Sequence, residues 1–260
     1  MTDFSAKNED YVASKVHAVT LAFWVVKIAA TTLGETGGDA LSMSMNLGYG
    51  LSSLIFAGIF LLALAAQVAE KRYHPLNYWF VIVATTTVGT TVSDYLDRTL
   101  ALGYTLSSIF LFASVLLVLA LWRMSTGTVS VTNIRSRKNE VFYWTTILAS
   151  NTLGTALGDF LADTKGFGYE GGALVFGGLI ALIAVAYYVT KRSPTLLFWS
   201  AFILTRPLGA TLGDILTKPN SQGGLQLDRI SSSAVIAIFM VICIMLTNLR
   251  KPAAPGRASH

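Results

Sequence analysis

The sequence is poor in charged residues, which make up 13% of its 260 residues, against about a quarter in soluble domains. It is correspondingly rich in apolar ones, with 53% hydrophobic residues and a mean hydropathy of +0.58. This composition excludes a water-soluble enzyme. The apolar residues fall in blocks of roughly 20, the length at which a helix crosses a ~30 Å hydrocarbon layer. The sequence therefore predicts an all-α integral membrane protein that is embedded in a lipid bilayer.

Cysteine and histidine are almost absent. The single cysteine, Cys243, allows neither an intramolecular disulfide nor a thiolate metal cluster. His17, His74 and His260 are scattered, so imidazole sites for zinc or copper are poorly supplied. No pairing of a nucleophile with a base, no HExxH and no phosphate-binding glycine loop is present. We expect no enzymatic activity and no cofactor other than a bound divalent cation.

Eight membrane spans are predicted, and the connections between them are short. They cover about residues 17–39, 46–68, 76–95, 103–122, 141–161, 170–190, 195–216 and 230–249. The first block leads on without a cleavage site, so we interpret it as a retained span. The prediction is one membrane domain at 17–249, between a cytoplasmic N-terminal tail (1–16) and a disordered cytoplasmic tail (250–260).

Lysine and arginine indicate the orientation of these spans. Most of the 19 lie in the two tails or after even-numbered spans, whereas the opposite side has Arg98, Lys165, Lys218 and Arg229. By the positive-inside rule both termini are cytoplasmic. The net charge of +5 is thereby explained by topology, and we expect no nucleic-acid partner. Lys27 and Arg206 remain, and both fall inside predicted spans.

A four-fold internal repeat is the strongest signal in the sequence. Each odd-numbered span begins with an aromatic residue and a tryptophan, followed ten residues later by a glycine and fifteen residues later by an aspartate. The tryptophans are Trp24, Trp79, Trp144 and Trp199; the glycines are Gly34, Gly89, Gly154 and Gly209; the aspartates are Asp39, Asp94, Asp159 and Asp214. The repeats cover about 17–70, 71–125, 136–190 and 191–249. We expect each to be a helical hairpin, four of them parallel around a pseudo-symmetric centre.

The stretch from Phe23-Trp24 through Gly34-Glu35-Thr36-Gly37-Gly38-Asp39, with its three counterparts, resembles a group of bacterial integral membrane proteins built of four tandem two-helix repeats with a characteristic tryptophan. The resemblance covers about residues 17–249. It implies the architecture and an inner (plasma) membrane location, but the family has no assigned function. Repeat four departs from the pattern, with Gly224 in place of the loop tyrosine and with an inserted Pro207.

A polar stripe is predicted along every odd-numbered helix, because residues four apart share a helix face. Stepping back from each aspartate gives Glu35 and Thr31, Thr90 and Thr86, Thr155 and Asn151, and Ala210 and Arg206, with Lys27 one turn beyond Thr31. Charged residues at membrane depth cost about 2.5–3.5 kcal/mol each and normally face a bundle interior. The odd-numbered helices should therefore line the inside.

Two sets of repeated residues have a structural interpretation. The pairs Gly34/Gly38, Gly89/Ser93, Gly154/Gly158 and Gly209/Gly213 are small-xxx-small motifs that allow helices to approach closely. The tryptophans and their aromatic neighbours are placed as an interfacial aromatic belt would be. We expect packing and anchoring from these residues, not ligand binding.

The four aspartates leave two interpretations open. In the first, each helix breaks at its glycines and the aspartate caps a following turn. In the second, the carboxylates lie ~22 Å along their helices, where the helix dipole disfavours an anion. There they bind a proton or a cation, as carboxylate rings do in cation channels. Arg206 and Lys27 are expected to pair with these acids, most simply Arg206 with Glu35 or an aspartate, although either could instead receive an anionic group.

The expected function is transport of a hard, oxygen-liganded divalent cation such as manganese, magnesium or calcium, with proton coupling. The metal ligands would be Asp39, Asp94, Asp159, Asp214 and Glu35, and the site would also include Thr31, Thr86, Thr90, Asn151 and Thr155. The alternatives are a cation channel with a carboxylate ring and a non-transporting scaffold or sensor with a structural polar network. The transported species is an ion or small solute; an oligomer is possible but not implied.

Overall fold

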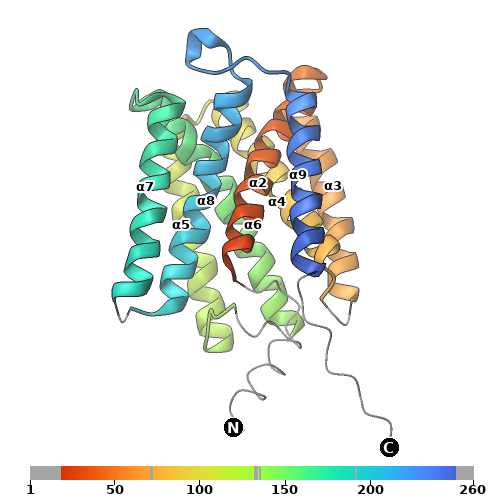
Figure 1. The fold of residues 1–260 in the computed structure, drawn as a ribbon, viewed down its shortest axis with the longest axis vertical. Coiled ribbons are helices and arrows are strands. Elements are labelled where there is room, and N and C mark those ends of the chain that lie inside the picture. Colours follow the sequence, from red (N-terminus) through yellow and green to blue (C-terminus); the bar gives the residue numbers. More distant parts are fainter. Residues whose placement is uncertain (1–18, 71–72, 132–133, 135, 191, 250–260) are drawn as a thin grey trace, which may run out of the picture.

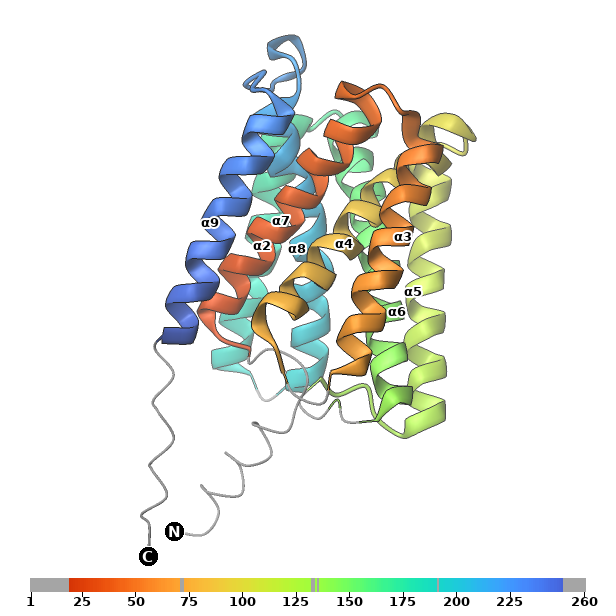
Figure 2. The same cartoon turned by 90° about the vertical axis from the view of Figure 1, so that its right-hand side faces the viewer.

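The computed structural model describes residues 19–70, 73–131, 134, 136–190 and 192–249. The predicted tails at 1–16 and 250–260 lie outside these residues. Eight long α-helices make up most of the described chain, close to the predicted spans. They are α2 (Leu21–Asp39), α3 (Gly48–Ala69), α4 (Pro75–Asp94), α5 (Tyr104–Thr126), α6 (Arg137–Asp159), α7 (Gly168–Val189), α8 (Pro194–Thr217) and α9 (Arg229–Leu249). They run side by side along one direction (Figures 1 and 2).

The odd-numbered predicted spans begin with two kinds of start signal. Thr20 and Ser136 cap α2 and α6, each accepting a hydrogen bond from a backbone N–H three residues on. Pro75 and Pro194 occupy the first positions of α4 and α8, where proline has no backbone hydrogen bond to lose. The repeat therefore uses a polar cap and a proline in alternation.

The repeated aspartates do not cap a new turn. In the first three repeats the helix runs through the aspartate and continues as one π-helical turn: η1 (Ala40–Ser44), η2 (Tyr95–Thr99) and η3 (Phe160–Thr164). Asp39, Asp94 and Asp159 have ordinary right-handed helical dihedrals and make no capping hydrogen bond. The first interpretation, a helix broken at the glycines with an aspartate cap, is therefore wrong, because the close-packed neighbours keep the glycine segments helical.

The four helices that carry the polar stripes form the inside of the molecule. The inner helices α2, α4, α6 and α8 pack against one another in a closed ring, each against the inner helix of the preceding and the following repeat. The outer helices α3, α5, α7 and α9 surround this ring. They expose many large apolar side chains, among them Leu62, Ile109, Leu174 and Val235. The prediction that odd-numbered helices line the interior is confirmed.

The two helices of a repeat are not each other's main partners. Instead, α3 packs mainly against α4, α5 against α6 and α7 against α8, and α9 closes the circle by packing against α2. Each outer helix therefore binds the next repeat (Figure 1). The prediction of self-packed hairpins is not confirmed, because the turn after each aspartate carries the outer helix across to its neighbour.

Five described helices are long and apolar enough to cross a membrane: α3, α5, α7, α8 and α9, the last over Arg229–Thr247. The inner helices α2, α4 and α6 are interrupted by threonines and charged residues. Their polar side chains are buried against the other inner helices, so the outer ring presents the apolar surface. The fold is compatible with a multi-pass membrane protein.

Candidate functional site

The polar stripes of the inner helices come together on the axis of the ring. Counted from the repeated tryptophan, equivalent positions form three successive layers. The central layer is Thr31, Thr86, Asn151 and Arg206; the Glu35 layer is Glu35, Thr90, Thr155 and Ala210; the aspartate layer is Asp39, Asp94, Asp159 and Asp214. All twelve residues are buried, none more than 3% exposed. Lys27 lies one turn below the central layer and is also fully buried.

The repeated aromatic residues close one end of this interior. Each residue before a tryptophan contacts the tryptophan of the next repeat. The ring-centroid distances are 5.6 Å for Phe23–Trp79, 5.7 Å for Tyr78–Trp144, 6.3 Å for Tyr143–Trp199 and 5.8 Å for Phe198–Trp24. Tyr78 and Tyr143 also share a hydrogen bond of 2.7 Å between their hydroxyls. We call this closed set the aromatic layer.

The aromatic layer is not the interfacial belt that the sequence suggested. Trp79, Trp144 and Trp199 are at most 4% exposed, and Phe23, Tyr78 and Tyr143 at most 1%, whereas residues of an interfacial belt face the lipid headgroups. A tryptophan at the start of a membrane helix has the same sequence pattern in both situations. The ring of inner helices directs these six side chains inward, whereas Trp24 and Phe198 are only partly buried.

The repeated glycines hold the inner helices together. A Cβ atom at Gly34 would lie 2.1 Å from Thr86 Oγ1, and one at Gly209 would lie 2.1 Å from Thr31 Oγ1. In the same way Gly89 packs against Asn151, and Gly154 packs against Arg206. Each glycine therefore leaves room for the central-layer residue of the next repeat. The predicted packing role of these glycines is confirmed. Thr31 and Thr86 use their hydroxyls within this contact, donating to Thr205 O and Ala30 O of the preceding repeat.

Arg206 reaches from the central layer to three residues of the Glu35 layer. Its Nη2 donates to Glu35 Oε2 at 3.0 Å and to Thr155 Oγ1 at 2.7 Å, and it also donates to Thr90 Oγ1. Thr90 in turn donates to Glu35 Oε2 at 3.2 Å. The structure therefore brings together four predicted site residues from four different repeats around one buried ion pair.

Lys27 has no carboxylate partner within the described residues. Its Nζ lies 3.4 Å from Asn151 Oδ1 and 4.2 Å from the centre of the Phe202 ring. The amide nitrogen of Asn151 donates to Thr85 Oγ1 at 2.9 Å, which directs the amide oxygen toward the lysine. The predicted pairing of Lys27 with an acid is absent from this part of the molecule.

Three basic residues pair with the aspartate layer. Arg229 Nε lies 3.6 Å from Asp39 Oδ2, and Lys218 and Arg98 divide the layer into two bridged pairs. Lys218 Nζ lies 3.0 Å from Asp39 Oδ2 and 3.2 Å from Asp214 Oδ1. Arg98 lies 2.9 Å from Asp94 Oδ1 and 3.4 Å from Asp159 Oδ2. The positive-inside rule assigns Arg98 and Lys218 to the loops outside the membrane, and it does not reveal this pairing with the aspartates. The signal was their spacing, four residues after the aspartates of repeats two and four, where repeats one and three have Met43 and Asp163.

Two opposing effects act on the pKa of Lys218. Burial alone would lower its pKa, but the carboxylates of Asp214 and Asp39 raise it well above its ordinary value. The substitution of Gly224 for the loop tyrosine has its reason here, because a Cβ at Gly224 would lie 2.1 Å from the backbone oxygen of Lys218. The variant loop of repeat four thus passes directly against the backbone of the bridging lysine.

Three carboxylates converge at the junction of repeats four and one. Oxygen atoms of Glu35, Asp39 and Asp214 all lie within 4.8 Å of one another, and all three side chains are buried. Asp39 Oδ1 is buried without a hydrogen-bond partner among the described residues. Asp94 and Asp159, predicted as ligands of the same ion, are not part of this acidic cluster. An all-oxygen donor set of this kind suits a hard cation.

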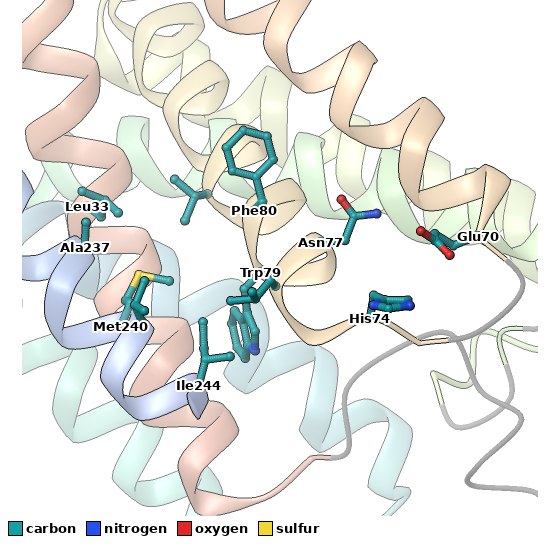
Figure 3. Close-up of a pocket in the computed structure, with 12 residues that line it drawn as sticks. Leu33, Glu70, His74, Asn77, Trp79, Phe80, Ala237, Met240 and Ile244 are labelled. Atoms are coloured by element: carbon teal, nitrogen blue, oxygen red, sulfur yellow. The ribbon is translucent and has the colours of Figure 1, made fainter. Parts of the chain in front are cut away.

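A groove on the outside of the ring is separate from these layers. It has a volume of about 680 Å³ and lies between α9, α2 and α4. Figure 3 shows Leu33, Phe80, Met240 and Ile244 along its apolar part, with Glu70, His74 and Asn77 at one end. Its lining includes none of the predicted site residues.

Comparison with known proteins identifies a repeat family. A family model described as a Repeat of Unknown Function (DUF347) matches four stretches, residues 22–73, 77–128, 142–193 and 197–251. No curated protein and no solved structure matches. The four matched stretches correspond to the four repeats around the ring, and they carry no assigned activity.

Proposed function

The chain belongs to this family of DUF347 repeats, and from its own residues we propose that it is a membrane carrier for a hard divalent cation such as manganese, magnesium or calcium. In this proposal the cation is exchanged for protons, and Glu35, Asp39 and Asp214 are its ligands. The eight helices all span the inner membrane, with both termini in the cytoplasm. The aromatic layer is then the cytoplasmic end of the pathway and the aspartate layer the outer end.

Eight spans are supported by the way the inner helices are enclosed. The helices α2, α4 and α6 contain 19 to 23 residues, and α2 and α4 run to about 30 Å at 1.5 Å per residue. They pack in the same ring as α8, which does qualify as a span by its own composition. A membrane that holds the outer ring therefore holds the inner ring at the same depth.

The acidic cluster is the observation that carries the proposal. Three carboxylates within 4.8 Å of one another repel unless positive charge neutralises them, and in this structure Arg206, Lys218 and Arg229 pair with them. Magnesium, calcium and manganese take carboxylate oxygens as ligands, and the buried Asp39 Oδ1 has no hydrogen-bond partner among the described residues. The ligands come from repeats one and four, on α2 and α8, so relative movement of these helices changes the site.

Lys218 competes with the cation for the carboxylates of Asp39 and Asp214. Its ammonium lies 3.0 Å from Asp39 and 3.2 Å from Asp214 and neutralises charge that a divalent cation would otherwise neutralise. Binding of the cation displaces Lys218 from the carboxylates, and its return helps to release the cation. Protons taken up by the carboxylates neutralise the remaining charge, which couples cation transport to a proton gradient.

A carrier is favoured over a channel because the interior is closed at two levels. The aromatic layer fills the axis on one side, and the two bridged pairs of the aspartate layer cross it on the other. A carrier opens these closures alternately. Arg206 and Pro207 also break the four-fold symmetry that a simple central pore would keep.

The test is divalent-cation flux in proteoliposomes that contain the purified full-length protein. Manganese, magnesium and calcium are supplied in turn under an imposed pH gradient. We expect Asp39→Asn to lower the flux at least tenfold. The matched control is Asp163→Asn, which removes the same charge from an exposed residue of the same end of the molecule and should leave flux unchanged. Equal flux in Asp39→Asn and the wild type, or no flux of any tested ion, would contradict the proposal.

The scaffold interpretation retains one supporting observation, the ion pairing of all four aspartates with basic side chains. It predicts that Asp39→Asn lowers thermal stability while no added ion changes the stability of the wild type. The carrier predicts a cation-dependent rise in melting temperature that Asp39→Asn removes. Electrical recording at fixed gradients separates a carrier from a channel, because channel currents are far larger.

A further inference from the structure

The interior between the aromatic layer and the aspartate layer contains more positive than negative charge. Its ionisable residues are Lys27, Arg206 and Glu35, which are 0%, 0% and 3% exposed. On their ordinary charges, two cations face one carboxylate. Glu35 is already engaged, since its Oε2 accepts from both Arg206 and Thr90. One positive charge is therefore left without a counter-charge in this buried region.

Arg206 has unused hydrogen-bond donors. All its described contacts with Glu35, Thr90 and Thr155 are made through Nη2. Its Nε and Nη1 are buried and have no hydrogen-bond partner among the described residues. Buried N–H groups of a charged side chain are almost always satisfied, and leaving them unpaired is costly. These donors therefore indicate a ligand with acceptor atoms.

Lys27 is the second incompletely paired cation. Its ammonium has three donors, but its contacts in the described part of the chain are Asn151 Oδ1 at 3.4 Å and the face of the Phe202 ring at 4.2 Å. Asn151, which contacts Lys27, lies one helical turn before Gly154, which packs against the side chain of Arg206. An anion that both basic residues can bind would stabilise them.

We propose that the interior holds a second ligand, a small monovalent anion that binds between Lys27 and Arg206. The ligand is a halide such as chloride, or the carboxylate group of a small solute. It accepts hydrogen bonds from Lys27 Nζ and from the free N–H groups of Arg206, and one negative charge balances the excess of one positive charge. A doubly charged anion would reverse the imbalance.

This anion site is distinct from the proposed cation site, although Glu35 lies next to both. The anion binds Lys27 and Arg206 in the middle of the interior, whereas the cation binds the acidic cluster at its outer end. Either could exist without the other. If both exist, Glu35 belongs to both, because it pairs with Arg206 and lies within 4.8 Å of Asp39 and Asp214.

The experiment measures the melting temperature of the detergent-solubilised full-length protein in sodium gluconate, sodium chloride and sodium formate at constant ionic strength and pH. Gluconate, a bulky monovalent anion, is the baseline. We expect a saturable rise of several degrees with chloride, formate or both. Chloride alone would assign a halide, and formate alone the carboxylate group of a small solute.

The decisive variant is Lys27→Met, which keeps an unbranched side chain one atom shorter and removes the charge. It should lose the anion-dependent rise. Its melting temperature in gluconate should equal or exceed that of the wild type, because an uncompensated buried charge is gone. Lys165→Met, a change of an exposed lysine, is the matched control and should keep the full rise.

Arg206→Lys is the second variant. It keeps a positive charge opposite Glu35 but removes the free guanidinium donors, so we expect at least a tenfold loss of anion affinity. No anion-dependent rise in the wild type, or an equal rise in Lys27→Met, would overturn the anion site. A manganese-dependent rise that persists in Lys27→Met would leave the cation site standing, so the two proposals can fail separately.

Discussion

At the scale of single residues, the ion pair of Arg206 and Glu35 is the contact on which the interior depends. Its nitrogen and oxygen atoms lie 3.0 Å apart, and the two side chains are 0% and 4% exposed. Burying a charge costs several kcal/mol even when it is paired, and far more when it is not. Removing one partner should therefore destabilise the folded protein much more than removing both.

Arg206→Met is expected to destabilise the protein by about 3–5 kcal/mol, because it leaves Glu35 buried without its partner. The double variant Arg206→Met with Glu35→Gln should recover most of this loss, since both charges are then absent. Unfolding free energies measured in mixed micelles give the coupling between the two sites. Arg192→Met, at an exposed position, is the control. A double variant as unstable as the single one would mean that Arg206 contributes mainly through packing.

Sequence reasoning found the buried stripe because steps of four residues along a helix preserve its face. That step correctly selected Glu35, Thr90, Thr155 and Arg206. It missed Arg98 and Lys218, because both follow an aspartate that ends the predicted span and were counted with the loops. Which acid meets which base also depends on the neighbouring repeat, and a periodicity within one chain segment contains no information about neighbours.

At the scale of helices, the ring is built by glycines that admit a side chain of the next helix. Gly34 receives Thr86, and Gly209 receives Thr31. This close approach allows Thr86 to donate its hydroxyl to a carbonyl of the preceding inner helix at 3.1 Å. In a membrane, where apolar burial does not drive helices together, such contacts are the main source of association.

Gly34→Ala and Gly58→Ala should have opposite effects on the stability of the folded protein. A Cβ at Gly34 would lie 2.1 Å from Thr86 Oγ1 and 3.0 Å from Thr86 backbone carbon, so we expect a loss of about 1–3 kcal/mol or more from overpacking. At Gly58 nothing lies within 4 Å, so alanine should be neutral or stabilise the helix by up to about 1 kcal/mol. Thermal unfolding of the two variants measures the difference. Equal melting temperatures would show that the ring tolerates wider spacing.

The assignment of outer helices to neighbours lay beyond the sequence. The pattern predicted a turn and a returning helix, and the positive φ angles of Gly48, Gly103 and Gly168 agree with a glycine in each turn. The exit direction of α3 is set by the π-helical turn Ala40–Ser44, which has no recognised sequence signature. The sequence pattern therefore predicts how many helices there are and which are inner or outer. It does not predict which outer helix packs against which inner helix.

At the scale of the whole molecule, the proposed topology places the turns after the aspartates outside and the connections after the outer helices in the cytoplasm. Met45 follows η1 and is 55% exposed, and Ser125 lies exposed at the end of α5. The two positions are at opposite ends of the bundle. Because Cys243 is the single cysteine, its replacement leaves a background suited to labelling.

In a Cys243→Ala background, Met45→Cys should react with a membrane-impermeant maleimide on intact cells, because it faces the outside. Ser125→Cys should react only after the membrane is permeabilised. The measurement is labelling before and after permeabilisation. The reverse pattern would overturn the orientation, and labelling of both positions from outside would overturn the eight spans.

The two bridges of the aspartate layer cross the same boundary in opposite directions. Arg98, in the first two repeats, reaches Asp159 in the last two, and Lys218, in the last two, reaches Asp39 in the first two. Such reciprocity is the signature of an isologous dimer. The single chain thus has the geometry of a two-repeat subunit paired with its own copy about a two-fold axis. The two halves are not identical, since Lys27 and Glu35 occur in the first half alone and Arg206 in the second alone.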